Sequence, residues 1–396
     1  MVVSEINLPI NSTIYEPQTK NLKKLTFEAL KKKILESEIP NLIISSPTLV
    51  IVNDGHRSTP SHKIIDILLT IPNHKMEKII IATGTHKPPT NKELFQIFRT
   101  HTNKLGVEVV IHDSQADNLI YKGTTERGTE IHLNPIVDEY EQILCINSVE
   151  PHFFAGFTGG VKSIIPGLAG KKTVEKNHSW ALDPNTGPAK IEGNPLQTDL
   201  REALTFLNNM LLGIQILNIG DEIYDIICGD LNEVASEAIE KSKEIFCIKL
   251  SEPVDVVVSL VYPPLNRSLY QAQKGIENTR QILRKGGEMI LVAECTNGIG
   301  NDLFYKTISR FNSPSDVISQ LNRENYSFGD HKAVKFSTIS LESTVRLIGN
   351  ISEIECKRLF ALKMEMESLE YHLRELSDKG KKIAIVLDSG VLAMTL

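Results

Sequence analysis

The stretch from Glu150 to His178 combines a cluster of glycines with one central lysine and two histidines. Glycines let the backbone approach a ligand closely, and their amides can line an anion-binding site. Lys162 comes just after Gly159 and Gly160, and we expect it on the first turn of a helix. From the residues alone, a phosphate-binding turn with an adjacent lysine explains this pattern as well as a more specialised site does, because glycine-rich loops are a weak functional signal by themselves.

Three of the eleven histidines stand where a reaction could use them. His86 and His152 directly follow predicted strands, and His178 follows the end of a polar helical segment. A pair of imidazoles suits a reaction that removes a proton on one face of a carbon and delivers one on the other, because histidine titrates near neutral pH. We therefore expect acid and base chemistry from this group.

The first half of the chain alternates β-rich runs with helical patterns, which is typical of an α/β fold. The predicted strands are 48–52, 78–82, 107–111 and 142–146. Asp54 and Arg57 follow the first strand, His86 the second and His152 the fourth. Ligands of open α/β sheets bind beyond the carboxyl ends of the strands. These side chains are therefore expected to converge in one crevice.

A second α/β unit is predicted from about residue 250. A strand at 254–258, a helix from Tyr270 to about Leu283 and a strand at 288–293 follow one another, and a charged helical pattern at 352–379 precedes a last strand at 382–387. A chain of 396 residues is also too long for one ordinary core. We expect two α/β domains, residues 1–249 and 250–396, with a cofactor and substrate cleft between them.

Composition excludes several other classes of protein. The chain is 41% hydrophobic and 23% charged, and its formal charge of −6 gives no basic surplus for nucleic acid or an anionic membrane. The five cysteines are dispersed, which argues against a disulfide framework and a cysteine-rich zinc site. The first residues do not form a secretory signal, and no apolar run reaches the roughly 18 residues that a membrane span requires. A cytoplasmic protein is expected.

Several short segments, taken in order, resemble the LarA family of nickel-pincer lactate racemases and their relatives. DGHRSTP from Asp54 is similar to the D-x-T-R-x-x-P loop of the family, and GTHK from Gly84 to its GTHR motif. The stretch from Glu150 resembles its E-P-H…G-G-x-K…N-H signature, spacing included. YQAQK from Tyr270 resembles a Y-Q-x-x-K helix start, and AECTNGIG from Ala293 another recurring segment. The resemblance spans nearly the whole chain.

The resemblance implies a nickel-pincer nucleotide, which is the nickel complex of pyridinium-3,5-bisthiocarboxylic acid mononucleotide. Lys162 matches the lysine that binds this cofactor covalently, and His178 matches the protein ligand of the nickel ion. Two sulfurs, one ring carbon and one imidazole nitrogen form a roughly square-planar set, which suits Ni(II). Asp54, Gly159 and Gly160 are expected around the cofactor. The enzymes that build the cofactor are implied partners.

The implied activity is inversion of C2 of a 2-hydroxy acid by a racemase or epimerase. One histidine, His86 or His152, takes the hydroxyl proton while the C2 hydride moves to the pyridinium. The 2-oxo acid then turns, and the hydride returns to its other face with the opposite histidine as acid. A cofactor is useful because the C2 hydrogen is far too weakly acidic for direct removal by imidazole.

Substrate binding is implied for a second group of residues. Arg57 and Lys274 match family positions that hold the substrate carboxylate, and Gln271 and Tyr270 lie beside them in the sequence. The simpler interpretations are a surface ion pair of Arg57 with Asp54 and a solvated helix position for Lys274.

The chain departs from the family pattern in the second domain. Lactate-specific members carry a tryptophan near the substrate, whereas the only tryptophan here is Trp180, and the comparable region is NYSFGDHK at 325–332. His331 and Lys332 either reach a larger or more acidic substrate or simply begin a helix. Lactate and another 2-hydroxy acid are therefore equally supported.

Two other functions are alternatives to this one. A non-catalytic carrier or sensor of the cofactor would keep Lys162 and His178 but would need neither His86 nor His152. A nicotinamide-dependent dehydrogenase is disfavoured, because no G-x-G-x-x-G motif follows the first strand.

Overall fold

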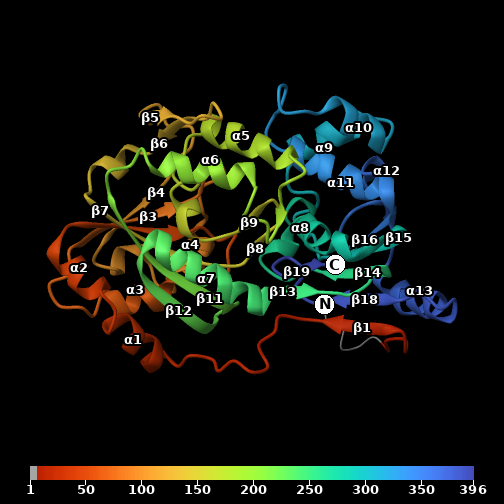
Figure 1. Cartoon of the computed structure of the whole chain (residues 1–396), viewed down its shortest axis with the longest axis horizontal. Helices are drawn as coiled ribbons and strands as arrows, with labels where there is room; N and C mark the ends of the chain where they lie inside the picture. Colours follow the sequence, from red (N-terminus) through yellow and green to blue (C-terminus); the bar gives the residue numbers. More distant parts are fainter. Residues whose placement is uncertain (1–6) are drawn as a thin grey trace.

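The computed structural model describes residues 7–396, which form two α/β units side by side (Figure 1). The first unit contains a six-stranded sheet in the order β12-β11-β7-β2-β3-β4. Its strands are β2 (Thr48–Asn53), β3 (Met76–Ala82), β4 (Glu108–Ile111), β7 (Gln142–Ser148), β11 (Met210–Ile219) and β12 (Glu222–Asp230). Neighbouring strands are parallel except β11 and β12, which form an antiparallel pair.

Helices cover both faces of this sheet, because alternate residues of each strand point to opposite sides. On β2, Val50 and Val52 pack into one apolar cluster with α1 (Phe27–Leu35), α2 (Ile39–Ser45), α3 (Ser61–Leu68) and α4 (Asn91–Phe98). Leu49 and Ile51 face the opposite cluster, which includes α5 (Lys171–Ser179) and α6 (Pro195–Leu204). Helix α7 (Leu231–Phe246) packs along β11 and β12. Every central strand is thus buried on both faces, which explains its continuous apolar sequence.

The second unit contains an all-parallel sheet in the order β1-β18-β14-β15-β16-β17. Its strands are β1 (Ser12–Tyr15), β14 (Val254–Leu260), β15 (Leu283–Val292), β16 (Thr344–Ile348), β17 (Leu362–Lys363) and β18 (Ile383–Val386). Its helices are α8 (Leu269–Thr279), α9 (Asp302–Ser309), α10 (Pro314–Gln320), α11 (Asp330–Glu342), α12 (Glu353–Arg358) and α13 (Met366–Asp378). Helices α8, α9 and α11 cover one face of the sheet, and α13 covers the other.

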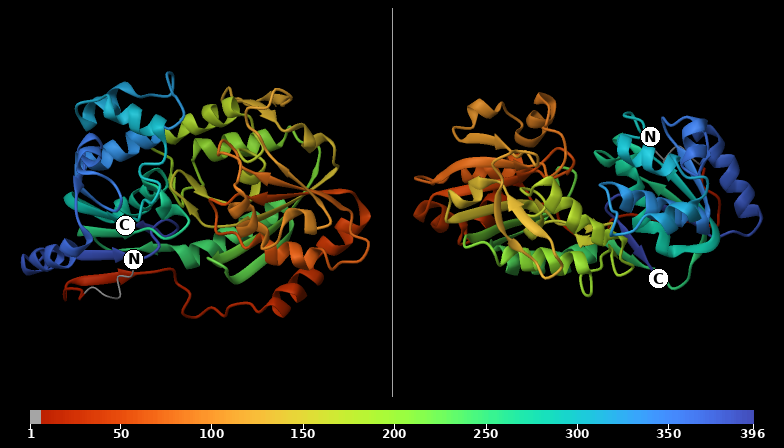
Figure 2. Two further views of the ribbon diagram at one scale, coloured as in Figure 1. Left: turned by 180° about the vertical axis from the view of Figure 1, so that it is seen from behind. Right: turned by 90° about the horizontal axis from the view of Figure 1, so that it is seen from above.

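The chain crosses between the two units twice. Strand β1 pairs with β18 before the chain runs to α1 in the other unit, and the C-terminal end lies beside the second sheet (Figures 1 and 2). The return crossing leads through β13 (Cys247–Lys249), which pairs with β19 (Ala393–Thr395). The expected division at residue 249 assigns Ser12–Tyr15 to the first domain, whereas this strand is hydrogen-bonded into the second sheet.

The predicted class, two α/β units, is confirmed, and the structure corrects several details. The charged segment at 352–379 is not one helix: α12 ends before Phe360, whose left-handed φ of 57° breaks the helix, and β17 separates α12 from α13. Lys162 lies in a short 3₁₀ helix, Gly160–Ser163, and His178 lies within the last turn of α5. Among residues 7–396, no helix is long and apolar enough to cross a membrane.

Candidate active site

A cleft lies between the two units, and residues of both units line it. The sequence-predicted residues that line it are Asp54, Arg57, His86, His152, Gly159, Lys162, His178, Tyr270, Gln271 and Lys274. Gly160 is not among the lining residues. The first sheet contributes loops that follow its strands, and the second unit contributes α8 and the start of α11.

Asp54 fixes the orientation of His86. Asp54 lies in the loop after β2, His86 lies after β3, and Nδ1 of His86 is 2.6 Å from Oδ2 of Asp54. Burial alone would raise the pKa of Asp54, but the charge and hydrogen bond of His86 outweigh it, and the pKa lies below its usual value. Asp54 is therefore a carboxylate that accepts the Nδ1 proton. The other ring nitrogen, Nε2, remains available to a substrate.

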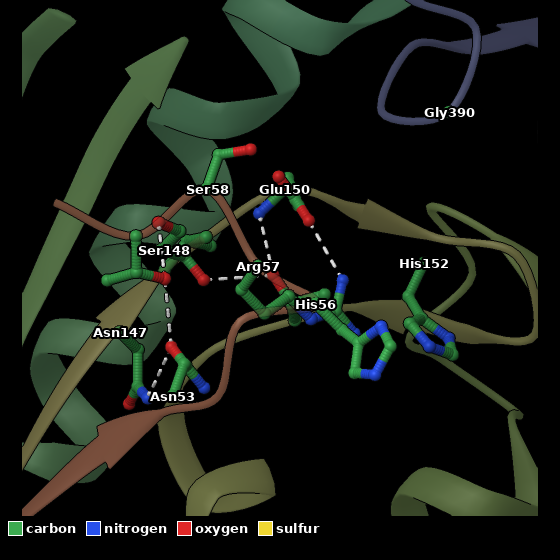
Figure 3. Close-up of polar contacts among 12 residues, drawn as sticks. Asn53, His56, Arg57, Ser58, Asn147, Ser148, Glu150, His152 and Gly390 are labelled. Atoms are coloured by element: carbon green, nitrogen blue, oxygen red, sulfur yellow. Dashed lines mark hydrogen bonds and ion pairs between the residues drawn. The ribbon is translucent and has the colours of Figure 1, made fainter. Parts of the chain in front are cut away.

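Arg57 pairs with Glu150 rather than with Asp54. Its Nη1 atom donates to Oε1 of Glu150 at 2.9 Å, and Figure 3 shows this contact beside His152. Glu150 immediately precedes β8 (Pro151–His152), so the ion pair connects the loop after β2 to the segment that carries His152. A guanidinium has five N–H donors, and one contact leaves donors for a ligand in the cleft. Sequence analysis gave no role to Glu150, although its acidic character two residues before His152 was visible.

The glycine turn is packed tightly against β11. Gly159 has a φ of +80°, and a Cβ atom there would lie 2.6 Å from Cγ2 of Val149 and 2.7 Å from Oε1 of Gln215. The amide of Gly160 donates to the same Gln215 oxygen at 2.8 Å. This amide is therefore occupied inside the protein, and Gly160 faces away from the cleft.

Replacing Gly159 by alanine is expected to lower the free energy of unfolding by about 1–3 kcal/mol more than Gly193→Ala does. Gly193 is the matched control, because its φ is +69° but a Cβ atom added there would have no other atom within 4 Å. Both variants bear the cost of a left-handed alanine, and only Gly159→Ala adds a clash. Urea unfolding of the two variant apoproteins measures the free energy of unfolding of each. Equal losses would show that the turn has room for a side chain.

The ring of Phe154 lies at the centre of the candidate catalytic group. Its centroid is 4.6 Å from that of His152, 5.1 Å from that of His178 and 5.3 Å from that of His331. Nζ of Lys162 lies 5.5 Å from the same centroid. One aromatic side chain therefore gathers four polar groups from three separate segments. Its importance was not predicted, because a phenylalanine after a strand is usually a core residue.

Lys162 and His178 are both open to a ligand. Burial, followed by the nearby charges of Arg57 and Lys274, lowers the pKa of Lys162 well below its usual value, and none of these causes is an acidic group. Burial and then Lys162 lower the pKa of His178 to about 3. Its buried Nδ1 atom has no hydrogen-bond partner among the described residues. Neutral imidazole and neutral amine are the forms that bind a metal and attack a carbonyl carbon, respectively.

His152 is held by the backbone. Its Nδ1 atom accepts a hydrogen bond from the N–H of Ala155 at 3.2 Å, so a neutral His152 carries its proton on Nε2. Burial, followed by the charge of Lys162, lowers its pKa well below the usual value. An anion bound beside Lys162 would offset the charge of that lysine and so raise the pKa of His152.

The second unit contributes a row of polar groups. Lys274, on α8, is 9% exposed, and burial followed by the charge of Arg57 lowers its pKa to about 7. His331 and Lys332 both lie in the first turn of α11 and line the cleft. The helix start is therefore confirmed, and contact of these residues with a substrate stays a prediction. Nδ1 of His331 lies 2.7 Å from the Tyr326 hydroxyl. Nζ of Lys332 donates to the backbone oxygen of Tyr270.

A second group of potential metal ligands lies at the edge of the cleft. Donor atoms of Asp54, His56 and His86 lie within 4.8 Å of one another. Burial, followed by the charge of His86, lowers the pKa of His56 to about 4, so its imidazole is neutral. His56 occupies the threonine position of the D-x-T-R-x-x-P loop, and no role was predicted for it.

Comparison with known proteins agrees with this architecture. The family model of the lactate racemase N-terminal domain matches residues 5–188, and that of the C-terminal domain matches residues 250–390. The lactate racemase of Thermoanaerobacterium thermosaccharolyticum is 28% identical over 302 residues, which are 74% of this chain and 70% of the relative. The lactate racemase of Lactiplantibacillus plantarum is 28% identical over 314 residues, or 74% and 71% of the two chains.

Two solved structures share the fold. The lactate racemase apoprotein from Thermoanaerobacterium thermosaccharolyticum superposes with a TM-score of 0.84 at 24% identity, over 96% of this chain and 97% of the other. A Thermotoga maritima protein solved in a structural genomics programme gives a TM-score of 0.77 at 18% identity, over 96% and 100%. The two domain matches occur in order and together span most of the sequence, and the chain therefore belongs to the lactate racemase family.

Proposed function

We propose that this protein is a racemase or epimerase that inverts C2 of a 2-hydroxy acid, either lactate or a related, larger acid. The observation that carries the proposal is the convergence of His86, His152, Lys162 and His178 in one cleft between the units. Residues 1–249 would supply the cofactor and catalytic groups, and residues 250–396 the substrate-binding groups. The named relatives are lactate racemases, which supports the same reaction class.

The cleft fits a nickel-pincer nucleotide. Lys162 presents an amine with no acidic neighbour, which suits covalent attachment, and the imidazole of His178 lacks a hydrogen-bond partner, which suits a nickel ligand. Gly159 lines the cleft, and Val149 and Gln215 fill the space that a side chain there would occupy. When bound, the nucleotide supplies a hydride acceptor that can return the hydride. The enzymes that make the nucleotide are proposed partners, and protein produced without them is expected to be inactive apoprotein.

The two histidines exchange the hydroxyl proton. Asp54 holds the Nδ1 proton of His86, so its Nε2 lone pair can accept the proton of the substrate hydroxyl as the carbonyl forms. The backbone N–H of Ala155 donates to Nδ1 of His152, so Nε2 of His152 can accept a proton only after this hydrogen bond opens and Nδ1 carries the ring proton. Once the 2-oxo acid has turned, the histidine on the other side returns a proton to the oxygen. Each histidine acts as base for one enantiomer and as acid for the other.

Arg57 and Lys274 are proposed to hold the substrate carboxylate from opposite units. Arg57 is fixed by Glu150, and Lys274 lies on α8 with Tyr270 and Gln271 on the preceding turn. The buried Oε1 of Gln271 has no hydrogen-bond partner among the described residues, so this amide could turn toward a bound substrate. Because the two cations belong to different units, substrate binding would draw the units together and exclude water.

The Michaelis constant is expected to rise with pH because of Lys274. Its pKa of about 7 means that the amine is charged below pH 7 and neutral above it. The attraction for a carboxylate is therefore present at low pH and lost as pH rises, and KM should increase about tenfold per pH unit above pH 7. Initial rates between pH 6 and 9 measure this. Lys274→Arg should flatten the rise, and an unchanged profile in that variant would assign the pH dependence to another group.

Nickel binding is expected to depend on His178 and not on His56. Purified holo-protein carrying His178→Ala should lose most of its nickel, because an imidazole ligand is missing, whereas His56→Ala should retain it. Metal analysis of both variants beside the wild type gives the answer. The reverse result would place the metal at Asp54, His56 and His86.

Stereochemical assay of holo-protein tests the function. Protein made with the cofactor-building enzymes is incubated with single enantiomers of several 2-hydroxy acids, and chiral chromatography follows the opposite enantiomer. The alternative is a carrier or sensor of the cofactor. Protein that carries nickel and the Lys162 adduct but converts no acid in the panel would favour that alternative.

A further inference from the structure

The cleft contains more cationic side chains than one carboxylate can use. Lys274 and Lys332 are 9% and 3% exposed, and Lys162 lies beside them in the same cleft. Arg57 already forms an ion pair with Glu150. Within residues 7–396, none of the three lysines forms an ion pair with a carboxylate. Carboxylates act on two of these lysines without forming an ion pair: Glu150 and Asp54 on Lys274, and Glu277 on Lys332. Buried amines that lack a direct ion-pair partner are costly in a folded protein. Such a group indicates bound anions.

Two of the three lysines have a proposed role. Lys162 attaches the cofactor, and Lys274 holds the C1 carboxylate together with Arg57. Lys332 remains. Its neighbour one turn along α11, Lys335, does not share this situation, because Lys335 forms an ion pair with Glu277 at 3.3 Å.

Lys332 is placed to bind a ligand. Its Nζ atom lies 4.0 Å from the ring centroid of Tyr270 and 4.8 Å from that of Phe153. This atom donates one hydrogen bond, to the backbone oxygen of Tyr270. Burial, followed by the charge of Lys274, lowers the pKa of Lys332 well below its usual value, and a bound carboxylate would favour the charged form again. The ammonium form has three N–H donors, so two are left for such a ligand. Two aromatic rings and one carbonyl therefore hold the amine at the cleft surface with unused donors.

Lys332 lies close to the site proposed for C1. Nζ of Lys274 is 5.9 Å from the same Phe153 ring centroid that Nζ of Lys332 approaches to 4.8 Å. Two anions bound by these amines would be separated by only a few carbon atoms. Both lysines also belong to the second unit, whereas Lys162 and the glycine turn belong to the first. The location thus favours the substrate over the nucleotide phosphate.

We propose that Lys332 forms a subsite for a second carboxylate and that the preferred substrate is a short 2-hydroxy dicarboxylic acid. The inference rests on the proposed racemase function and specifies its substrate class. Arg57 and Lys274 bind C1, and Lys332 binds the distal carboxylate. Both amines lie near the ring of Phe153.

The test compares 2-hydroxysuccinate with 2-hydroxy-4-methylpentanoate, whose terminal branch has the shape of a carboxylate without its charge. Wild-type holo-protein should show a kcat/KM at least about tenfold higher for 2-hydroxysuccinate. Lys332→Met should lower that value about 10- to 100-fold, the usual effect of a charge-assisted hydrogen bond, and change the other acid less than about threefold. Lys332→Arg should retain the preference. Lys306→Met is the control, because Lys306 is an exposed lysine of α9 that does not line the cleft, and it should leave the ratio of the two values unchanged.

Other outcomes overturn the subsite. Equal losses for both acids would assign Lys332 a structural role in holding α11 against α8. Loss of nickel or of the Lys162 adduct in Lys332→Met would assign it to the nucleotide phosphate. A wild-type preference for the uncharged branch would also exclude the subsite.

Calorimetric titration of the apoprotein separates this inference from the proposed function. Tighter binding of 2-hydroxysuccinate than of 2-hydroxy-4-methylpentanoate, lost in Lys332→Met, would support the subsite even if holo-protein racemised neither acid. In that case only the racemase function would fail. Equal binding of the two acids by wild-type apoprotein would contradict the subsite whatever the activity.

Discussion

Replacing His86 by glutamine is expected to lower the rate of racemisation by about 10²- to 10⁴-fold, the usual contribution of a general acid or base. Nε2 of His86 is the proposed proton acceptor, and its Nδ1 is held by Asp54 at 2.6 Å. Glutamine keeps a polar side chain of similar length but cannot exchange a proton near neutral pH. Chiral chromatography from each enantiomer measures the loss. The rate should fall in both directions, because each histidine takes part in both.

The same variant should retain its cofactor. His86 is assigned no role in covalent attachment or in nickel binding, so intact mass and nickel content should match those of the wild type. His101→Gln is a suitable control, because His101 is an exposed histidine that packs near Phe95 outside the cleft. Full activity in His86→Gln would contradict the assignment. Loss of nickel in that variant would instead point to the Asp54, His56 and His86 group as the metal site.

Replacing Lys162 by methionine is expected to abolish both the covalent adduct and the activity. The amine is the proposed attachment point, and methionine preserves length and most of the volume without a nucleophilic nitrogen. Intact-mass spectrometry of protein made with the cofactor-building enzymes should show only the unmodified chain. Chiral chromatography should detect no turnover. Because the wild-type amine has no acidic neighbour, the apoprotein variant should unfold at a urea concentration no lower than that of the wild type.

Lys172→Met provides the matched control for this experiment. Lys172 is an exposed lysine on α5, ten positions along the chain from Lys162. This variant should carry the full adduct and full activity. An adduct that persisted in Lys162→Met, at another residue, would overturn the attachment site and with it the proposed arrangement of the cofactor.

The local sequence was sufficient to predict four strands of the first sheet, three strands of the second, and the side of the first sheet that carries the site. Strands β1, β11, β12, β16 and β17 were not predicted. Buried parallel strands are continuous apolar runs, and the polar residues that follow them, such as Asp54 and His86, must lie at one edge. The pairing of β1 with β18 was not predictable in this way. It joins Ser12–Tyr15 to Ile383–Val386, and no local pattern specifies a partner so distant in the chain.

Contacts between distant residues also limited prediction of the site. Arg57 was expected to hold the substrate carboxylate, with an ion pair to Asp54 as the simpler alternative. Its partner in the structure is Glu150, 93 positions away. Gly160 was expected to offer its amide to an anion, but that amide donates to Gln215 on β11. The position of Phe154 among four polar groups likewise depends on how three segments pack. The residue types predicted the chemistry, and tertiary packing determined which groups remain available for it.

The most direct test of the account follows deuterium at C2. Holo-protein is incubated in ordinary water with one enantiomer of a 2-deuterated 2-hydroxy acid, which is either lactate or the acid that the enzyme converts fastest. The products are separated by chiral chromatography, and mass spectrometry measures their deuterium content. Transfer of the C2 hydrogen as hydride, with the two histidines moving only the hydroxyl proton, predicts the opposite enantiomer with deuterium retained. Exchange of that deuterium for solvent hydrogen, or full retention of optical purity with every acid tested, would contradict the proposed function.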